Sequence, residues 1–304
     1  MGVITFYFSM LALIAPLGAV AGVGAYWARS RAEFPAQFIA VLATTVTTPC
    51  LVFHNLVTTS LSNQTIFSVA GATLAALVLC QLLNSIGLKL FKLPVRKLLL
   101  SATFPNAGNL GLPVAWLAFG EEGLSTAIAF LATCSFYQHT VGVRTLPNTG
   151  GLPPAWKSPV FLVTLAALAC RLADFMPPAF ILESTKMLGS ITVPIMLLGL
   201  GHALALMPPS GLKLGSIVGC MRLIVGMASG YLAGRLLGLP EQVVNAITLQ
   251  MTMPCAAISY MYTRRYTDMG DTAAGAVLVS TLVFFLLSPF LFWLLGSPAA
   301  RLGG

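Results

Sequence analysis

The sequence predicts an all-α polytopic membrane protein with ten transmembrane helices, arranged as two inverted five-helix repeats. Of its 304 residues, 57% are hydrophobic and only 8% are charged, and the mean hydropathy is +0.90. Soluble domains carry about 25% charged residues. Apolar stretches long enough to cross a membrane alternate with short polar loops. Proline-interrupted stretches also recur at matching places in the two halves of the chain.

The expected helices account for nearly the whole chain. In chain order they are 3–27, 34–57, 64–91, a broken stretch between Lys97 and Glu121, 123–143, 158–176, 184–207, 212–238, 241–263 and 272–295. The first is expected to be retained, because a signal peptide would begin with positive residues and have a shorter apolar core. Residues 144–157 are rich in proline and glycine, as is typical of a linker.

The fourth expected helix contains the stretch around which the rest is organised, Ser101–Gly123, with Pro105 and Pro113 inside it. A proline removes a ladder hydrogen bond, and in lipid each freed backbone group costs several kcal/mol unless it finds a partner. From Lys97 to Glu121 a helix would extend roughly 36 Å, enough to cross a core of about 30 Å once. We therefore expect a helix that is broken at mid-depth and lines a polar cavity.

The two halves resemble each other in the positions of their prolines. The matching pairs are Pro49 with Pro194, in the second and seventh helices, and Pro113 with Pro254, in the fourth and ninth. Because five is an odd number, the second half must be inverted relative to the first. The predicted division is 1–145 for the first repeat, 146–157 for a cytoplasmic linker and 158–304 for the second repeat. Paired breaks of this kind indicate a transporter binding site.

Lysine and arginine predict the orientation. The loops after odd-numbered helices hold most of them: Arg29, Arg31, Lys89, Lys92, Arg96, Lys97, Arg144, Lys157, Lys213, Arg264 and Arg265. The positive-inside rule places these loops in the cytoplasm and both termini outside, in the cell (inner) membrane. It also explains the net charge of +8 better than nucleic-acid binding does, since no dense basic patch occurs.

Enzyme chemistry is not indicated. The six cysteines are scattered singly through apolar segments and form no C-x-x-C pair, as expected of small buried side chains rather than a metal site. No nucleophile constellation, zinc motif or phosphate loop occurs. We expect no metal, no cofactor and no catalytic residue.

The run PNAGNLGLP, followed by FGEEG, resembles the auxin efflux carrier family of membrane transporters, whose bacterial members include malonate and malate carriers. Plant auxin carriers have a similar P-N-x-x-x-x-G-x-P run, which matches Pro105, Asn106, Gly111 and Pro113. Further similar stretches are Pro49–His54, GLGHALALMP around His202, and MPCAAISYMYTRRY from Met253 to Tyr266. The resemblance covers nearly the whole chain.

The resemblance implies that the broken fourth and ninth helices cross at their breaks. It also implies a scaffold of helices 1, 2, 6 and 7, a mobile transport unit of helices 3, 4, 5, 8, 9 and 10, elevator-like movement and homodimers. One departure is that residues 67–77 carry no charge here, whereas plant members have acidic and basic residues in the third helix.

The crossing predicts an anion site. If the second half-helices begin near Pro113 and Pro254, each N-terminus presents unpaired N–H groups and about half a positive charge, which favours a carboxylate. Asn106 and Asn109 can donate amide N–H groups to an anion, or can satisfy backbone groups that the break exposes. The expected substrate-binding residues are Asn106, Asn109, Gly111, Pro113, Gln250, Pro254 and Ser259.

Coupling or support residues are a separate group. His54, His139 and His202 have near-neutral reference pKa values, so each is a candidate proton carrier or a neutral, hydrogen-bonded histidine. Arg222 lies inside the eighth expected helix, where it can compensate substrate charge or reach an interface by snorkelling. The expected coupling or support residues are His54, His202 and Arg222.

The sequence therefore predicts a secondary transporter that moves small organic anions by alternating access. A symporter driven by a coupling ion, H⁺ or Na⁺, is the alternative within this class. An ion channel would need a continuous polar pore, and an intramembrane enzyme would need paired acids at mid-depth, which the sequence does not supply. The sequence specifies neither the substrate, the transport direction nor the coupling ion.

Overall fold

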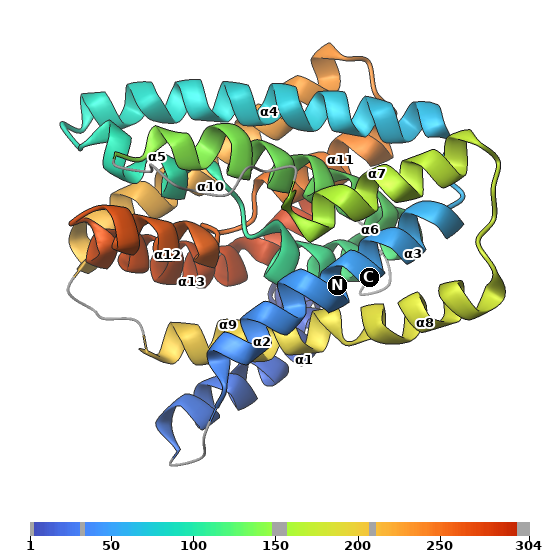
Figure 1. Cartoon of the computed structure of the whole chain (residues 1–304). Coiled ribbons are helices and arrows are strands. Elements are labelled where there is room, and N and C mark those ends of the chain that lie inside the picture. The colour runs from blue at the N-terminus through green and yellow to red at the C-terminus, as the bar shows by residue number, and fades with distance from the viewer. Residues whose placement is uncertain (1–2, 31–33, 148–156, 207–210, 297–304) are drawn as a thin grey trace.

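The structure, a computed structural model, describes residues 3–30, 34–147, 157–206 and 211–296 (Figure 1). These residues form helices and contain no strand. Five helical stretches among them are long and apolar enough, by length and composition, to cross a membrane: Asn63–Leu90, Ala107–Thr145, Ala179–Leu206, Leu212–Leu236 and Gly270–Leu294. This all-helical, apolar architecture is that of a polytopic membrane protein, because only helices or closed barrels satisfy the backbone in lipid.

The first half of the chain forms α1 to α6 and four shorter helical turns. Their bounds are α1 Val3–Arg29, α2 Ala36–Leu42, the π-turn η1 Ala43–Thr47, α3 Thr48–Thr58, α4 Asn63–Leu90, α5 Val95–Thr103, the π-turn η2 Ala107–Gly111, α6 Leu112–Tyr137, the π-turn η3 Gln138–Gly142 and the 3₁₀ turn η4 Val143–Thr145. The second expected helix thus consists of α2, η1 and α3, and the fourth begins with α5 and η2.

The second half forms α7 to α13. Their bounds are α7 Pro159–Leu172, α8 Ala179–Ser190, α9 Thr192–Leu206, α10 Leu212–Leu236, α11 Glu241–Met251, α12 Ala257–Tyr266 and α13 Gly270–Leu294. The seventh expected helix is divided into α8 and α9 beside Ile191, and the ninth into α11 and α12 around Pro254. The seventh begins at Ala179, five positions earlier than expected.

Local sequence determines where α10 ends and α11 can begin. Gly238 adopts a φ of +64°, a conformation that glycine takes without strain. Its N–H donates to the carbonyl of Arg235, and the N–H of Leu239 donates to the carbonyl of Gly234. These two bonds satisfy carbonyls at the helix end in a Schellman-type cap, and Pro240 then precedes the first residue of α11.

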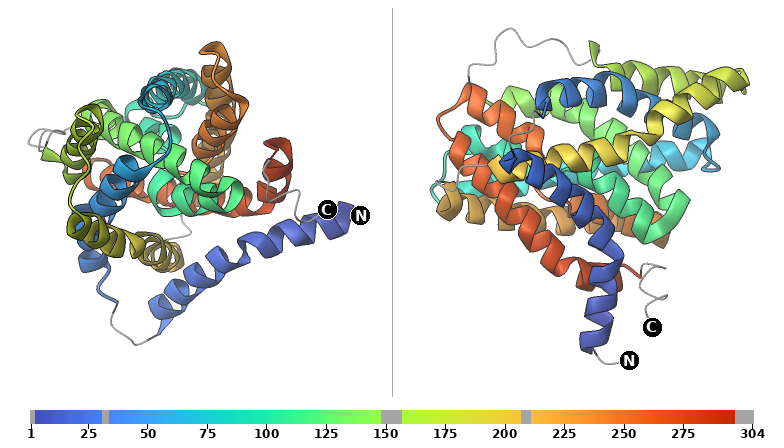
Figure 2. Two further views of the ribbon diagram at one scale, coloured as in Figure 1. Left: turned by 90° about the vertical axis from the view of Figure 1, so that its right-hand side faces the viewer. Right: turned by 90° about the horizontal axis from the view of Figure 1, so that it is seen from below.

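The helices pack in two sets, which Figure 2 shows from two further sides. In one set α1 lies against α9, and α3 lies against α7 and α8. In the other, α10 lies against α4, α11 and α13, while α6 lies against α4 and α11. The two sets meet where α9 contacts η2, where α6 contacts α3 and α7, and where α1 contacts α13.

Glycines on α10 bring its neighbours close. A Cβ atom added at Gly215, at Gly219 or at Gly211, which directly precedes α10, would collide with the backbone of α13, and one at Gly226 with the carbonyl of Met251 at the end of α11. A Cβ atom at Gly230 would lie 2.9 Å from Thr248 Cα. Small residues of this kind allow membrane helices to approach closely.

The first break lies at Phe104–Asn106, and the expectation that the fourth helix breaks at Pro113 is wrong. α5 ends at Thr103 and helix resumes at Ala107, so Pro113 lies inside the helical arm that begins at Ala107. The π-turn η2 directly precedes Pro113, and its wider hydrogen-bond spacing, with Leu112 N–H donating to Ala107 O, accommodates the proline ring there.

The chain reverses direction at Gly120. This residue adopts φ +66° and ψ −151°, a region open essentially to glycine alone. A Cβ atom on Gly123 would lie 2.7 Å from the carbonyl oxygen of Ala115, eight residues back, which a straight helix would hold about 12 Å away. The two arms on either side of Gly120 therefore fold against each other, at the turn expected before residue 123.

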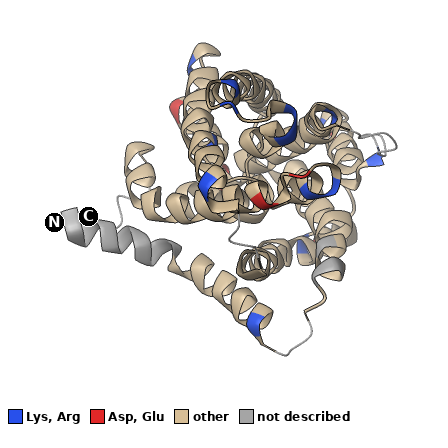
Figure 3. Ribbon diagram, turned by 90° about the vertical axis from the view of Figure 1, so that its left-hand side faces the viewer, with Lys and Arg blue, Asp and Glu red and all other residues tan. Residues whose placement is uncertain are grey.

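Basic residues gather at one end of the bundle, which Figure 3 views directly. α4 and α12 end there, while α5, α10 and α13 begin there (Figure 1). Lys97 Nζ at the start of α5 lies 2.7 Å from Asp268 Oδ1, in the turn between α12 and α13. This ion pair joins the outer ends of the two interrupted helices.

Candidate functional site

The two interrupted helices cross at their breaks and are hydrogen-bonded to each other there. The N–H of Asn106 donates to the carbonyl of Pro254 at 2.7 Å, and the N–H of Ala256 donates to the carbonyl of Phe104 at 3.0 Å. These two bonds form an isolated antiparallel bridge between Pro105 and Cys255. Each break therefore supplies partners for the backbone groups that the other exposes, which lipid could not do.

Prolines make this arrangement possible without unpaired donors. Pro105 and Pro254 have no N–H, so neither needs an acceptor at the place where its helix stops. The N–H of Cys255 donates to Ser280 Oγ on α13 at 3.0 Å. The crossing is consequently held to α13 as well as to itself.

Two helical arms start at the crossing, η2 with α6 and α12. The carbonyl of Asn106 accepts the N–H groups of Leu110 at 3.3 Å and Gly111 at 2.9 Å, which starts η2 with a widened turn. The first N–H groups of such an arm have no acceptor within the helix and carry partial positive charge. Asn106 is 4% exposed, and its side-chain Nδ2 has no hydrogen-bond partner among the described residues.

The π-turn η2 borders the other set of helices. Asn109 on η2 is half-buried. A Cβ atom added to its neighbour Gly108 would lie 3.4 Å from Met196 Cε on α9. The start of this arm therefore faces α9 across the boundary between the two sets.

Gln250 reaches from α11 to the same π-turn. Its Nε2 donates to the carbonyl of Gly111 at 2.7 Å, while its buried Oε1 has no partner in the described part of the chain. A side chain at position 111 would collide with Gln250 Oε1, so glycine is needed there for close approach. Asn106 and Gln250 thus place a free amide donor and a free carbonyl acceptor around η2.

Ser259 lies on α12 behind the crossing and is fully buried. Its Oγ accepts a 3.2 Å hydrogen bond from Gln138 Nε2 on the π-turn η3. One turn further, Thr263 Oγ1 lies 3.4 Å from Ser101 Oγ on α5. These contacts tie α12 to α5, the first half of the other crossing helix, and to η3, which follows α6.

Arg222 lies behind the crossing on the opposite side, at the ends of the first half-helices. It is 0% exposed. Its Nη2 donates to the carbonyl of Met251, the last residue of α11, and its Nη1 lies 3.0 Å from Cys80 Sγ on α4. From the same helix α4, Asn84 Nδ2 donates to the carbonyl of Ala102 near the end of α5 at 2.9 Å.

His54 and His202, the two histidines expected to act in coupling or support, lie away from the crossing. His54 Nδ1 is 3.1 Å from the carbonyl of Leu182, so His54 joins α3 to α8 within one set. His202 stacks on Phe34, with ring centroids 4.1 Å apart. A proton-coupling role for either residue stays a prediction.

The crossing thus brings together most of the expected site residues. Asn106, Gly111, Pro254, Gln250 and Ser259 contact one another or the same crossing backbone, while Pro113 is buried one turn further along. Comparison with known proteins identifies the family of the chain. The family model described as "Membrane transport protein" matches residues 9–151 and 150–293. The chain belongs to the auxin efflux carrier family of membrane transporters.

A curated relative supports the membership in this family. An uncharacterized transporter of Methanocaldococcus jannaschii is 28% identical over 230 residues, which cover 69% of this chain and 72% of that protein. An auxin efflux carrier family member is a multi-pass membrane transporter, so the crossing is a candidate substrate site rather than an active site.

Four residues at this candidate site were not predicted from the sequence. They are Cys80, Asn84, Gln138 and Gly226. Asn84 could have been noticed as an uncharged polar residue within a long apolar helix, where an unbonded amide is costly. Gly226 belongs to a series with four-residue spacing, Gly226, Gly230 and Gly234, which is a packing signal in membrane helices.

Proposed function

We propose that this carrier is a secondary transporter of small organic anions, auxin-like monocarboxylates or dicarboxylates, which binds a carboxylate at the crossing. The observation that carries the proposal is the buried Asn106 side-chain Nδ2, which has no partner among the described residues and lies where η2 begins. A buried amide without a partner costs about 1–3 kcal/mol. A carboxylate would remove that cost and would also accept from the free N–H groups of the two starting arms.

The architecture proposed for this transporter is two inverted five-helix repeats. Equivalent helices in the two halves make equivalent contacts, which supports the proposal. On α4 Asn84 bonds the end of α5, and on α10 Arg222 bonds the end of α11. α4 and α10 correspond to the third and eighth expected transmembrane helices. Each therefore directly precedes, in the chain, the broken helix whose first half it contacts.

Movement is proposed to be elevator-like. The set with α1, α2, α3, α7, α8 and α9 corresponds to the scaffold that the family resemblance implies, and the set with α4, α5, α6 and α10 to α13 to the transport unit. The whole crossing belongs to the second set. Asn106 and Gln250 are buried, so a substrate can enter only after the two sets shift relative to each other.

The oligomeric state and the orientation in the membrane are also proposed. We propose a homodimer in the cell (inner) membrane with both termini outside, since positive residues gather at the end of the bundle where α4 and α12 end.

Uptake into proteoliposomes tests the function. Labelled monocarboxylates and dicarboxylates would be offered to vesicles that contain the purified protein, with and without Na⁺ and proton gradients. We expect saturable uptake of at least one carboxylate, which Asn106→Ala reduces and Asn55→Ala does not. Asn55 is a matched control because its Nδ2 donates to the carbonyl of Leu51 within its own helix. Currents far above carrier turnover, or no uptake of any carboxylate by the wild type, would contradict the proposal.

A further inference from the structure

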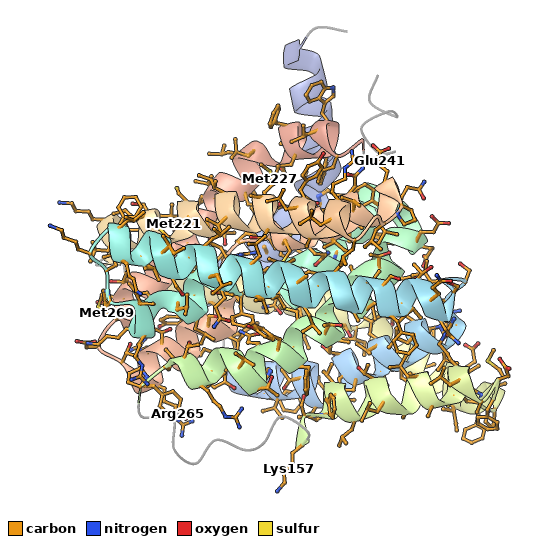
Figure 4. The ribbon with its side chains drawn as sticks, turned by 90° about the horizontal axis from the view of Figure 1, so that it is seen from above. Lys157, Met221, Met227, Glu241, Arg265 and Met269 are labelled. Atoms are coloured by element: carbon orange, nitrogen blue, oxygen red, sulfur yellow. The ribbon has the colours of Figure 1, made fainter. Side chains whose placement is uncertain are left out.

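Arg222 sits where the two first half-helices end. α10, which carries it, runs beside α4, as Figure 4 shows with Met221 and Met227 labelled on α10. The guanidinium is wholly inside the protein, at 0% exposure. Such a position excludes snorkelling to the membrane surface, so the charge must be compensated where it lies.

The guanidinium contacts the end of α11 directly. Nη2 donates to the carbonyl of Met251, the last residue of that helix. Gly226, one turn after Arg222, leaves the space for this contact, because a Cβ atom there would collide with the Met251 carbonyl and lie 2.7 Å from Arg222 Nη2. The close approach is therefore built into the sequence of α10.

The guanidinium reaches the end of α5 through one intermediate. Nη1 lies 3.0 Å from Cys80 Sγ, and Cys80 Sγ lies 3.8 Å from the carbonyl of Thr103, the last residue of α5. Asn84 contacts the same sulfur at 3.2 Å and donates to Ala102. Arg222 thus faces both helix ends whose exposed carbonyls carry partial negative charge.

No acidic side chain balances this charge in the part of the chain that the structure describes. The ion pair found there is Lys97–Asp268, at the end of the bundle. The compensation comes from carbonyl groups at two helix C-termini, each equivalent to about half a negative charge. Unwound carbonyls and half-helix C-termini are also the groups with which broken-helix transporters hold a coupling cation.

We infer that Arg222 is a tethered cation, fixed by the chain in the place where a broken-helix transporter could otherwise bind an exchangeable Na⁺ or K⁺. The inference deepens the proposed function and rests on it, since a coupling cation has meaning only in a transporter. The inference excludes coupling to an exchangeable metal cation, because the wild-type carrier would need no such cation in the medium. Removal of the guanidinium leaves carbonyls that a small cation can occupy.

Thermal unfolding of the purified protein tests this without any knowledge of the substrate. The melting temperature would be measured by tryptophan fluorescence in equal concentrations of NaCl, KCl and the chloride of the bulky cation N-methyl-D-glucamine. Wild type is expected to melt at the same temperature in all three. Arg222→Gln is expected to melt several degrees lower in N-methyl-D-glucamine, and to recover saturably in NaCl or KCl.

Two variants complete the design. Arg222→Lys retains a positive charge on a long side chain and is expected to melt alike in all three salts. Arg235→Gln is the matched control on the same helix, since Arg235 is exposed and bonds Tyr231, and no salt effect is expected. If Arg222→Gln does not fold, the melting temperatures of wild type and Arg222→Lys in the three salts still test whether a fixed positive charge replaces a metal cation.

Three results would overturn the inference. They are a saturable stabilisation of wild type by Na⁺ or K⁺, an Arg222→Gln variant as stable as wild type in N-methyl-D-glucamine, and an Arg222→Gln variant destabilised equally in all three salts. Because no substrate enters these measurements, a failure to transport carboxylates would count against the proposed function alone.

Discussion

The carbonyl oxygen of Pro254 accepts the backbone N–H of Asn106 at 2.7 Å, although the two residues lie in different halves of the chain. The reciprocal bond from Ala256 to Phe104 makes the contact an isolated two-stranded bridge between helical segments. Each broken helix therefore depends on the other for its backbone partners. Any change that separates the breaks exposes unpaired groups in lipid, at several kcal/mol each.

Close packing at the π-turn η2 gives the first prediction. Gly111→Ala places a methyl group against Gln250 Oε1 and should destabilise the protein by about 1–3 kcal/mol. Gln250→Ala removes the atom that the methyl group would strike, so the double variant should lose at least about 0.5 kcal/mol less than the sum of the single variants. Denaturant unfolding of the four proteins measures this coupling.

The matched control for that cycle is Gly71→Ala on α4. Gly71 is exposed, and a Cβ atom there would meet nothing within 4 Å. Its substitution should be neutral or slightly stabilising, because alanine favours helix over glycine. Strict additivity of Gly111→Ala and Gln250→Ala would show that the two residues do not touch in solution.

Much of this arrangement follows from the sequence, but the position of the first break does not. Either Pro105 or Pro113 could interrupt the helix, because both lack a backbone N–H. The sequence pattern favoured Pro113, because it occupies the position in the first half that corresponds to Pro254 in the second. In the structure a π-turn absorbs Pro113 and the chain stops at Pro105. A π-turn has no distinctive residue signature, so local sequence could not choose between the two prolines.

The buried contacts that join Cys80 to Arg222 and to the end of α5 could not be predicted from the sequence either. From the sequence, each cysteine is expected to be a small buried apolar residue. In the structure, Cys80 contacts both Arg222 and the last residue of α5. That role depends on α4 and α10 lying side by side, and the residues are 142 positions apart in the chain. Gln250 and Ser259, by contrast, were predicted from their places beside Pro254, because a residue next to a break stays next to it in the fold.

The ion pair between Lys97 and Asp268 gives a prediction on pH. The Lys97 ammonium, hydrogen-bonded to the carboxylate, lowers the pKa of Asp268 from its usual value, with help from a backbone hydrogen bond. The pair therefore stabilises the fold above the pKa of the unfolded chain, about 3.9, and this contribution disappears as the pH falls through the lowered pKa.

Asp268→Asn isolates that contribution. Wild type should melt above the variant near neutral pH. The difference should shrink as the pH falls below about 4 and vanish once the pH is below the lowered pKa of Asp268. High salt should shrink the difference too, because both side chains are solvent-accessible. A difference in melting temperature that persists at low pH would mean that the asparagine acts through packing instead of charge.

Orientation gives the next prediction. Arg96 lies at the basic end of the bundle and Glu122 after the Gly120 turn, and both are exposed. In a cysteine-free background, Arg96→Cys should react with a membrane-impermeant thiol reagent only in inside-out vesicles, and Glu122→Cys in intact cells. The reverse pattern of labelling would invert the proposed topology.

The most direct measurement of the central claim is the affinity of purified Asn106 variants for the transported carboxylate. A hydrogen bond to a charged group contributes about 1.5–3 kcal/mol, so Asn106→Ala should weaken binding roughly ten- to a hundredfold. Asn106→Asp should bind more weakly still, since it sets a negative charge against an anion. Melting temperatures should fall less than affinities. Unchanged binding by Asn106→Ala, or tighter binding by Asn106→Asp, would contradict an anion site at the crossing.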